Sequence, residues 1–196
     1  MQPIILALHK PNATPWLEKL LEAGEVVAPV RGPGGDVVFS AVTSPDQVLW
    51  DFGNPLPPPK QFVLPQTDPL VKIQRTGQGY QVEPIYDDQP RALFNLRSCD
   101  VKGIVFLTRM HQTEPADASF LRRARHLTLI SLACNHPCPL GFCVCTDSGP
   151  FLTDGYDVQL PDLGEDYLVE VGTDRGQAVI AHVPNLFRAA TESEVS

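Results

Sequence analysis

Apolar and polar positions follow a clear pattern in the second half of the chain. Leu127–Leu132 is an almost wholly apolar run, and Arg91–Leu96 is a second run of strand length. Between them, a stretch that begins at Ser98 or Asp100 and another over residues 114–125 carry apolar residues at helical spacing. Apolar strands separated by helices are typical of a buried parallel sheet, so we predict one crossover unit with two parallel strands.

The first half of the chain is divided into shorter segments. A helix that opens at Asn12 or Thr14 and ends at Gly24 is predicted from its single apolar face. Strands over residues 25–30 and 36–40 follow, with a glycine-rich turn between them. This turn predicts a hairpin rather than a phosphate loop, because neither Lys-Ser/Thr nor a helix comes after it.

Proline and glycine interrupt the middle of the chain. We expect residues 62–66 to be extended and the polar segment 74–88 to form a small flap. Residues 157–160 and 167–171 predict two more strands, and the polar tail from residue 188 is expected to fray. Together the elements predict an α/β fold with a mixed, partly parallel sheet and crossover helices.

Composition narrows the possible function classes. The net charge of −8 argues against a general nucleic-acid role, which requires clustered Lys and Arg. No apolar run reaches the roughly 18 residues that a membrane span requires. The apolar residues 4–8 lack a basic leader, so we expect a cytoplasmic protein. In a reducing cytosol, clustered cysteines bind metal or perform redox chemistry more often than they form disulfides.

Cysteine spacing points to metal chemistry. Four of the five cysteines fall within residues 133–146, in the spacing C-x3-C-x4-C-x-C, and the fifth is Cys99. The spacing matches neither the bacterial ferredoxin run nor the paired C-x2-C of a zinc ribbon. We favour an iron–sulfur cluster, while structural zinc and unligated or redox thiols stay open as alternatives.

The predicted strands bring distant cysteines together. Cys99 and Cys134 each come just past the carboxyl end of a strand, so both should lie at one edge of the sheet, under the cysteine loop. Cys99 also opens a predicted helix, where free N–H groups favour a thiolate. His136 could ligate zinc, or iron in a Rieske-like centre, but no second histidine lies nearby, so we interpret it as a polar loop residue.

Several motifs match one family in the same order. They are Leu96-Arg97-Ser98-Cys99-Asp100, Leu132-Ala133-Cys134-Asn135-His136-Pro137, Phe142-Cys143-Val144-Cys145 and Asp162-Leu163-Gly164-Glu165-Asp166-Tyr167-Leu168-Val169-Glu170-Val171. This succession resembles the N-terminal region of the iron–sulfur beta subunits of multisubunit hydrogenases and sulfhydrogenases. The A subunit of anaerobic sulfite reductase is similar. The resemblance runs over nearly the whole chain.

The resemblance implies electron transfer between a catalytic subunit and other redox centres. The cluster ligands that it implies are Cys99, Cys134, Cys143 and Cys145. Cys138 is then a spare that could substitute for a neighbour. Ser98 stands where the family usually has proline, and the family's ferredoxin-like domain with two cysteine quartets has no counterpart in this sequence. We therefore expect a stand-alone version that docks to a separate electron carrier, or the product of a split gene.

These observations lead to one main functional hypothesis. The chain would be a non-catalytic electron-transfer subunit of a cytoplasmic oxidoreductase complex, hydrogenase- or sulfite-reductase-like, with one [4Fe-4S] cluster; [2Fe-2S] and zinc are the alternatives. Its partners would be a catalytic subunit, a separate ferredoxin-like protein, or both. Arg97, Lys102 and His136 could tune the cluster or dock a partner. The alternative function is a structural-zinc interaction module, and a flavin reductase ranks last because the sequence has no flavin fingerprint.

The same hypothesis divides the chain into parts. Residues 1–90 would be an N-terminal α/β part with a proline-rich connector and the flap. Residues 91–187 would be the cluster-binding α/β part, with the cysteine loop at the carboxyl edge of its strands, and residues 188–196 would be the polar tail. We expect these parts to form one compact unit.

Overall fold

A computed structural model describes residues 4–136, 138–139 and 141–195. Pro137, part of one motif, and Ser196, the end of the expected tail, lie outside these ranges. Within them, one sheet holds eight strands in the order β10-β1-β9-β8-β7-β6-β2-β3. The strands are β1 (Ile4–His9), β2 (Glu25–Arg31), β3 (Val37–Val42), β6 (Arg91–Leu96), β7 (Leu127–Leu132), β8 (Val158–Leu160), β9 (Asp166–Val171) and β10 (Phe187–Ala189).

Helices cover both faces of this sheet. On one face, α1 (Ala13–Ala23) and α4 (Asp174–Ala181) contribute buried residues to one core. On the other face, α2 (Ser98–His111) and α3 (Ala118–Arg125) contribute buried residues to a second core. The short helix α5 (Glu192–Val195) follows the last strand along the chain. Among the helices of the described residues, none combines the length and the apolar character that crossing a membrane requires.

The centre of the sheet is parallel, as predicted. β2, β6, β7 and β8 run in one direction, while β3, β9, β1 and β10 join as antiparallel pairs at its two sides. β6 pairs directly with β7, from Arg91 opposite Leu127 to Leu96 opposite Ser131, and α2 and α3 form the connection. The predicted mixed α/β fold and its crossover unit are therefore confirmed.

Both faces of the central strands are buried, which explains their continuous apolar runs. Leu93 and Leu129 pack in the core under α2 and α3, whereas Phe94 and Ile130 pack with Trp16 of α1 in the opposite core. Successive strand residues point to opposite faces, so a strand covered on both sides needs apolar residues at odd and even positions. Each such side chain stabilises the fold by about 1.5–3 kcal/mol.

The two ends of the chain join the sheet in a way that the sequence did not indicate. Residues 4–9 form β1 between β9 and β10, with Leu6 opposite both Val169 and Ala189. Arg188 lies in β10, and its guanidinium pairs with Asp166, 2.5 Å away, and with Glu194. The expectation that the tail frays from Arg188 is therefore wrong, because strand pairing and ion pairs hold it to the sheet.

Two local expectations also need correction. The stretch 62–66 is not extended: its first residue, Phe62, ends a 3-10 turn (Pro59–Phe62), and the Leu64 N–H donates to the Lys60 carbonyl at 2.8 Å. The second crossover helix begins at Ala118 rather than at residue 114. Asp117 caps it by accepting a hydrogen bond from the Phe120 N–H at 2.9 Å, which satisfies an otherwise free donor of the first turn.

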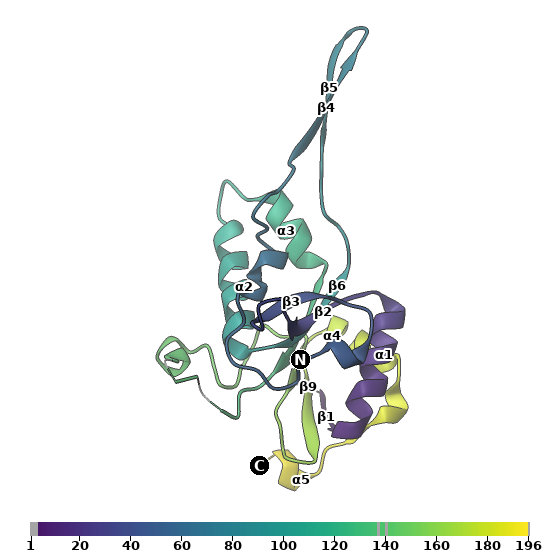
Figure 1. Cartoon of the computed structure of the whole chain (residues 1–196), viewed down its shortest axis with the longest axis vertical. Coiled ribbons are helices and arrows are strands. Elements are labelled where there is room, and N and C mark those ends of the chain that lie inside the picture. The colour runs from purple at the N-terminus through teal and green to yellow at the C-terminus, as the bar shows by residue number, and fades with distance from the viewer. Residues whose placement is uncertain (1–3, 137, 140, 196) are drawn as a thin grey trace.

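A two-stranded ribbon occupies the segment in which we expected a flap. β4 (Val71–Thr76) and β5 (Gly79–Pro84) pair only with each other, as a sheet separate from the main one. Figure 1 shows this ribbon projecting from the body of the molecule. Strands of six residues give it a length of about 20 Å.

Asn95 sets the direction in which the chain leaves β6. It is 1% exposed and has a φ of +59°, at a register shift between Leu93 and Leu96. Its amide donates to the carbonyl oxygens of Leu49, at 2.8 Å, and Trp50, at 3.2 Å. A left-handed conformation is unfavourable for most side chains, so these bonds help to hold the strand end in this shape.

We expect Asn95→Ala to lower the free energy of unfolding by about 2–3 kcal/mol, because it removes two hydrogen bonds and places alanine in the left-handed region. Asn95→Gly should cost about 1 kcal/mol less, since glycine adopts this φ freely. Urea unfolding of both variants measures the difference. Equal losses would mean that the backbone conformation contributes nothing.

Candidate metal centre

The parallel strands β6 and β7 place the first two cysteines. Cys99 is the second residue of α2, directly after β6, and Cys134 follows β7 by two residues. The strand ends are tied by the Ser131 hydroxyl, which donates to the Leu96 carbonyl at 3.1 Å. Both cysteines therefore lie at the carboxyl edge of the sheet, as predicted, because parallel strands end at the same edge.

The cysteine loop is fastened over this edge at Gly149 and Pro150. The Pro150 carbonyl accepts hydrogen bonds from the Cys134 N–H, at 3.4 Å, and from the Ser98 hydroxyl. Gly149 has a φ of +156°, and a Cβ there would lie 3.3 Å from the Ser98 Cβ and 3.8 Å from the Cys143 Sγ. A side chain at residue 149 would crowd the start of α2 and would be unfavourable at this φ, so glycine suits the close approach of the loop.

Ser98 has a different role from the helix cap that the sequence suggested. It is the first residue of α2, the N-cap position belongs to Arg97, and that position makes no side-chain capping bond. The Ser98 hydroxyl instead joins the loop at Pro150, and its backbone makes a hydrogen bond to Cys134 that lowers the pKa of that thiol. A proline at this position, which the resemblance led us to expect, would lack the N–H and could not make this bond to Cys134.

Charge interactions link four of the thiols. Burial, together with the negative charges of Asp100, Cys134, Cys138 and Cys143, raises the pKa of Cys99 to about 11, although one side of Cys99 is open to solvent. The raised pKa values of Cys99 and Cys134 favour neutral thiols at physiological pH in the absence of a bound cation. We expected the helix N-terminus to favour a thiolate at Cys99, but burial and the neighbouring negative charges oppose this effect. Metal binding to these cysteines must therefore release protons.

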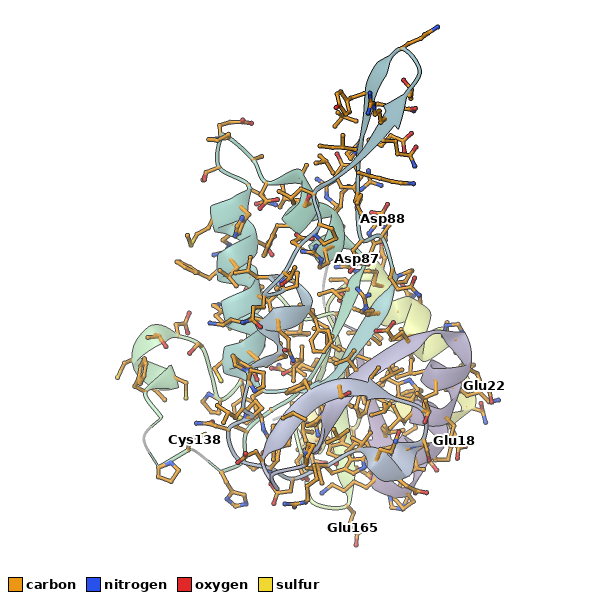
Figure 2. All side chains as sticks on the ribbon, turned by 45° about the horizontal axis from the view of Figure 1, so that its top comes forward. Glu18, Glu22, Asp87, Asp88, Cys138 and Glu165 are labelled. Carbon is orange, nitrogen blue, oxygen red and sulfur yellow. The ribbon has the colours of Figure 1, made fainter. Side chains whose placement is uncertain are left out.

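The remaining cysteines lie along the loop. Cys138, marked in Figure 2, donates through its thiol to the Asn54 side-chain oxygen at 3.0 Å. Cys143 and Cys145 share a short 3-10 turn (Cys143–Thr146), in which Cys143 is half-buried and Cys145 is exposed. The charges of Cys138 and Cys143 both act on Cys99 and Cys134, whereas Cys145 is exposed.

The three residues expected to tune the site or dock a partner have different surroundings. The Arg97 guanidinium stacks on the Phe52 ring, with 4.1 Å to the ring centroid, and helps to lower the pKa of Cys134 against the raising effect of burial. Lys102 makes an ion pair with Asp154 at 3.2 Å. His136 is exposed. Arg97 is therefore the one of the three whose charge acts on a cysteine in this structure.

Donor chemistry decides which groups the site fits. Across residues 4–136, 138–139 and 141–195, no group of three or more His, Cys, Asp or Glu could hold a single metal ion. A four-iron cluster spaces its thiolates more widely than a single ion does. Thiols from α2 and from both ends of the loop meet at one edge, and thiolates are the ligands of iron–sulfur clusters. The residues present therefore fit such a group in their chemistry.

Asp100 is a site residue that the sequence did not single out. Burial raises its pKa to about 6, partly opposed by the backbone and charge of Arg97. Its Oδ2 atom is buried and has no hydrogen-bond partner among the described residues. An acidic residue in the first turn of a helix is usually solvated and stabilising, so no local pattern distinguished this buried carboxyl.

One comparison with known proteins bears on the site. The chain is 29% identical over 189 residues to the Sulfhydrogenase 2 subunit beta of Pyrococcus furiosus. The match covers 96% of this chain and 54% of the relative, so the chain spans about half the length of that protein. No protein-family model matches the chain. The predicted resemblance to a hydrogenase beta subunit is confirmed as a similarity of sequence.

Asp100→Asn should change how the stability of the cluster-free protein depends on pH. The Asp100 pKa rises from 3.8 to about 6 on folding, so its contribution to stability is present below about pH 4 and is lost as the pH rises through about 6. Relative to the wild type, the variant should gain about 2 kcal/mol in free energy of unfolding between about pH 4 and about pH 8. Urea unfolding at both pH values measures this gain.

The matched control for this prediction is Asp46→Asn, because Asp46 is exposed and lies outside the cysteine site. It should leave the difference between the two pH values near that of the wild type. An equal gain in both variants would show that burial at Asp100 is not the cause.

Proposed function

We propose that this chain is an iron–sulfur electron-transfer subunit of a cytoplasmic oxidoreductase complex, hydrogenase- or sulfite-reductase-like. The similarity to a sulfhydrogenase beta subunit supports a place in such a complex. The observation that carries the proposal is the meeting of Cys99 and Cys134 at the carboxyl ends of two neighbouring parallel strands, beneath a loop with three more cysteines. Thiols gathered from distant parts of a chain are typical of a metal centre.

The proposed ligands of a single [4Fe-4S] cluster are Cys99, Cys134, Cys143 and Cys145, and Cys138 is a substitute. Such a cluster supplies one-electron transfer when it is bound. Cys138 and Cys145 are the two candidates for the fourth ligand, and the proposal assigns it to Cys145. Cys138 influences the pKa of Cys99, whereas Cys145 shares a turn with Cys143 and is exposed.

Residues around the ligands would set the electrostatics of the centre. The Arg97 guanidinium and the Ser98 backbone both favour negative charge on the Cys134 sulfur. Hydrogen bonds and positive charge near cluster sulfurs raise the reduction potential, so these groups would make the centre easier to reduce. Asp100 has the opposite effect on Cys99, because its charge raises the pKa of that thiol.

An apolar surface beside the cysteines is suited to a redox partner. Phe142 and Val144, which flank Cys143, are 69% and 76% exposed, and Phe151 is 55% exposed just after the loop. Large exposed apolar side chains that lie together commonly mark interaction sites. We propose that a catalytic subunit, a separate ferredoxin-like protein, or both bind here, because docking at the loop brings a partner close to the centre.

The first test is the metal content of protein purified without oxygen. We expect a brown protein with about four iron and four acid-labile sulfide per chain, as a [4Fe-4S] centre requires. Iron and sulfide assays and a visible spectrum give the answer. A colourless protein that holds zinc and no sulfide would replace the electron-transfer proposal with a structural-zinc module.

The second test assigns the ligands through single cysteine substitutions. Cys99→Ala should lose the cluster, since it removes one of four ligands, whereas Cys138→Ala should retain iron and sulfide at the wild-type ratio. Cys145→Ala is the discriminating variant and should also lose the cluster. Circular dichroism of each variant checks the fold. Loss with Cys138→Ala and retention with Cys145→Ala would contradict the assignment and make Cys138 the fourth ligand.

A further inference from the structure

A hollow between α2 and α3 combines aliphatic walls with a rim of arginines. Its volume is about 350 Å³, which is within the range of sites that bind small molecules. The two helices lie side by side (Figure 1), and β7, the start of α4 and Gly155 complete the lining. The apolar side chains that line it are all aliphatic: Ile104, Val105, Leu121, Ala124, Leu127 and Leu129.

Three of the lining residues are arginines, and within the described part of the chain no acidic residue lines the hollow. Arg109 comes from α2, Arg125 from α3 and Arg175 from α4. The Arg175 guanidinium donates to the Arg125 backbone carbonyl at 2.7 Å, so two of the three elements are joined at the rim. All three arginines are exposed, so a ligand can reach their guanidinium groups from solvent.

Two of these guanidinium groups have little or no neutralising partner. Arg109 lies 3.9 Å from Asp154, but that carboxylate is closer to Lys102, at 3.2 Å, and is shared by both cations. An exposed pair at the longer distance contributes little, so Arg109 remains available to an anion. Among the described residues, the Arg125 side chain has no hydrogen bond or ion pair.

The third guanidinium shares its carboxylate with other donors. Arg175 Nε donates to Asp157 at 3.3 Å, and this buried carboxylate also accepts from the Leu129 N–H, at 2.7 Å, and from the Thr173 hydroxyl. The rim therefore has a surplus of two positive charges, in a chain whose net charge is −8. The groups counted are four cations and the two carboxylates that pair with them: Lys102, Arg109, Arg125 and Arg175 against Asp154 and Asp157.

A second hollow, at the stem of the β4–β5 ribbon, has a different charge balance. Its volume is about 370 Å³, and its lining holds both signs of charge. The two guanidinium groups there are ion-paired with three carboxylates of the same lining: Arg91 and Arg123 with Glu25, Asp68 and Asp87. Those charges are satisfied within the chain, whereas the charges of the arginine rim are not.

Helix ends explain only part of the arginine rim. Arg109 and Arg125 lie in the last turns of α2 and α3, where any cation interacts favourably with the helix dipole. Lysine would serve that purpose equally well, and the dipole does not require the third arginine, Arg175, near the start of α4. Guanidinium groups are planar forks that bind phosphate oxygens in pairs, so three of them around one hollow suit a phosphate group.

We propose that this hollow binds a small organic phosphate with an aliphatic body. The phosphate group lies among Arg109, Arg125 and Arg175, and the body lies on the aliphatic walls. A phosphate monoester carries nearly two negative charges at pH 7, which matches the surplus of the rim better than a carboxylate does. Among the described lining residues no aromatic side chain is present on which a nucleotide base could stack, so the body is aliphatic.

The test is calorimetric titration of the full-length, anaerobically purified protein with alkyl phosphates at low ionic strength. Hexyl phosphate should bind with a dissociation constant of about 0.1 mM. Each methylene added between ethyl and hexyl phosphate should tighten binding about fourfold, as burial of a methylene group does. Inorganic phosphate and hexanol, which each lack one half of the ligand, should bind about 100-fold more weakly or not at all. Binding is measured directly, so the result does not depend on the proposed cluster.

Substitutions locate the site. Arg125→Gln should weaken hexyl phosphate binding about tenfold or more, because it removes a guanidinium group that has no other partner. Arg75→Gln is the matched control, since it removes the same charge from an exposed position on the ribbon and should leave binding unchanged. Ala124→Phe should block binding by filling the hollow from its wall. Circular dichroism checks the fold of each variant.

Four results would overturn the proposal. They are the absence of binding by any alkyl phosphate, an affinity that does not change with chain length, equal losses in Arg125→Gln and Arg75→Gln, and heptanoate binding as tightly as hexyl phosphate. Equal losses would mean that net charge alone attracts the anion, and tight heptanoate binding would make the ligand a carboxylate. If no alkyl phosphate binds and Arg125→Gln loses a co-purifying subunit, the rim belongs to a protein interface instead.

Discussion

The parallel pairing of β6 with β7 is the constraint on which the candidate site depends. Its hydrogen-bonded register brings the carboxyl ends of the two strands to one edge, so residues 35 positions apart, Cys99 and Cys134, become neighbours. An antiparallel arrangement would have sent them to opposite edges. Apolar residues on both faces of these strands stabilise the pairing, because they fill two cores at once.

Crowding of the thiols gives this edge its chemical character. Burial and mutual repulsion raise the pKa values of Cys99 and Cys134, and the buried carboxyl of Asp100 adds to the repulsion at Cys99. Arg97 and the Ser98 backbone act the other way at Cys134. The neutral thiol forms of Cys99 and Cys134 are therefore favoured in the free protein, and a bound cation would stabilise their thiolate forms.

The cysteine loop and the β4–β5 ribbon lie in different parts of the molecule. The cysteine loop lies at the edge formed by β6 and β7, whereas the β4–β5 ribbon projects from the body with Asp87 and Asp88 at its stem (Figure 2). The exposed side chains of Phe142 and Val144 belong to the loop and not to the ribbon.

The sequence by itself determined the crossover unit, the hairpin of β2 and β3, and the edge at which the cysteines meet. These features depend on local periodicity and on the rule that parallel strands end together. Only the tertiary structure decided the strand pairing of Leu6 with Val169, the ion pair of Arg188 with Asp166, and the burial of Asp100. Each of these depends on which distant segments come into contact, and no local pattern of apolar and polar residues contains that information.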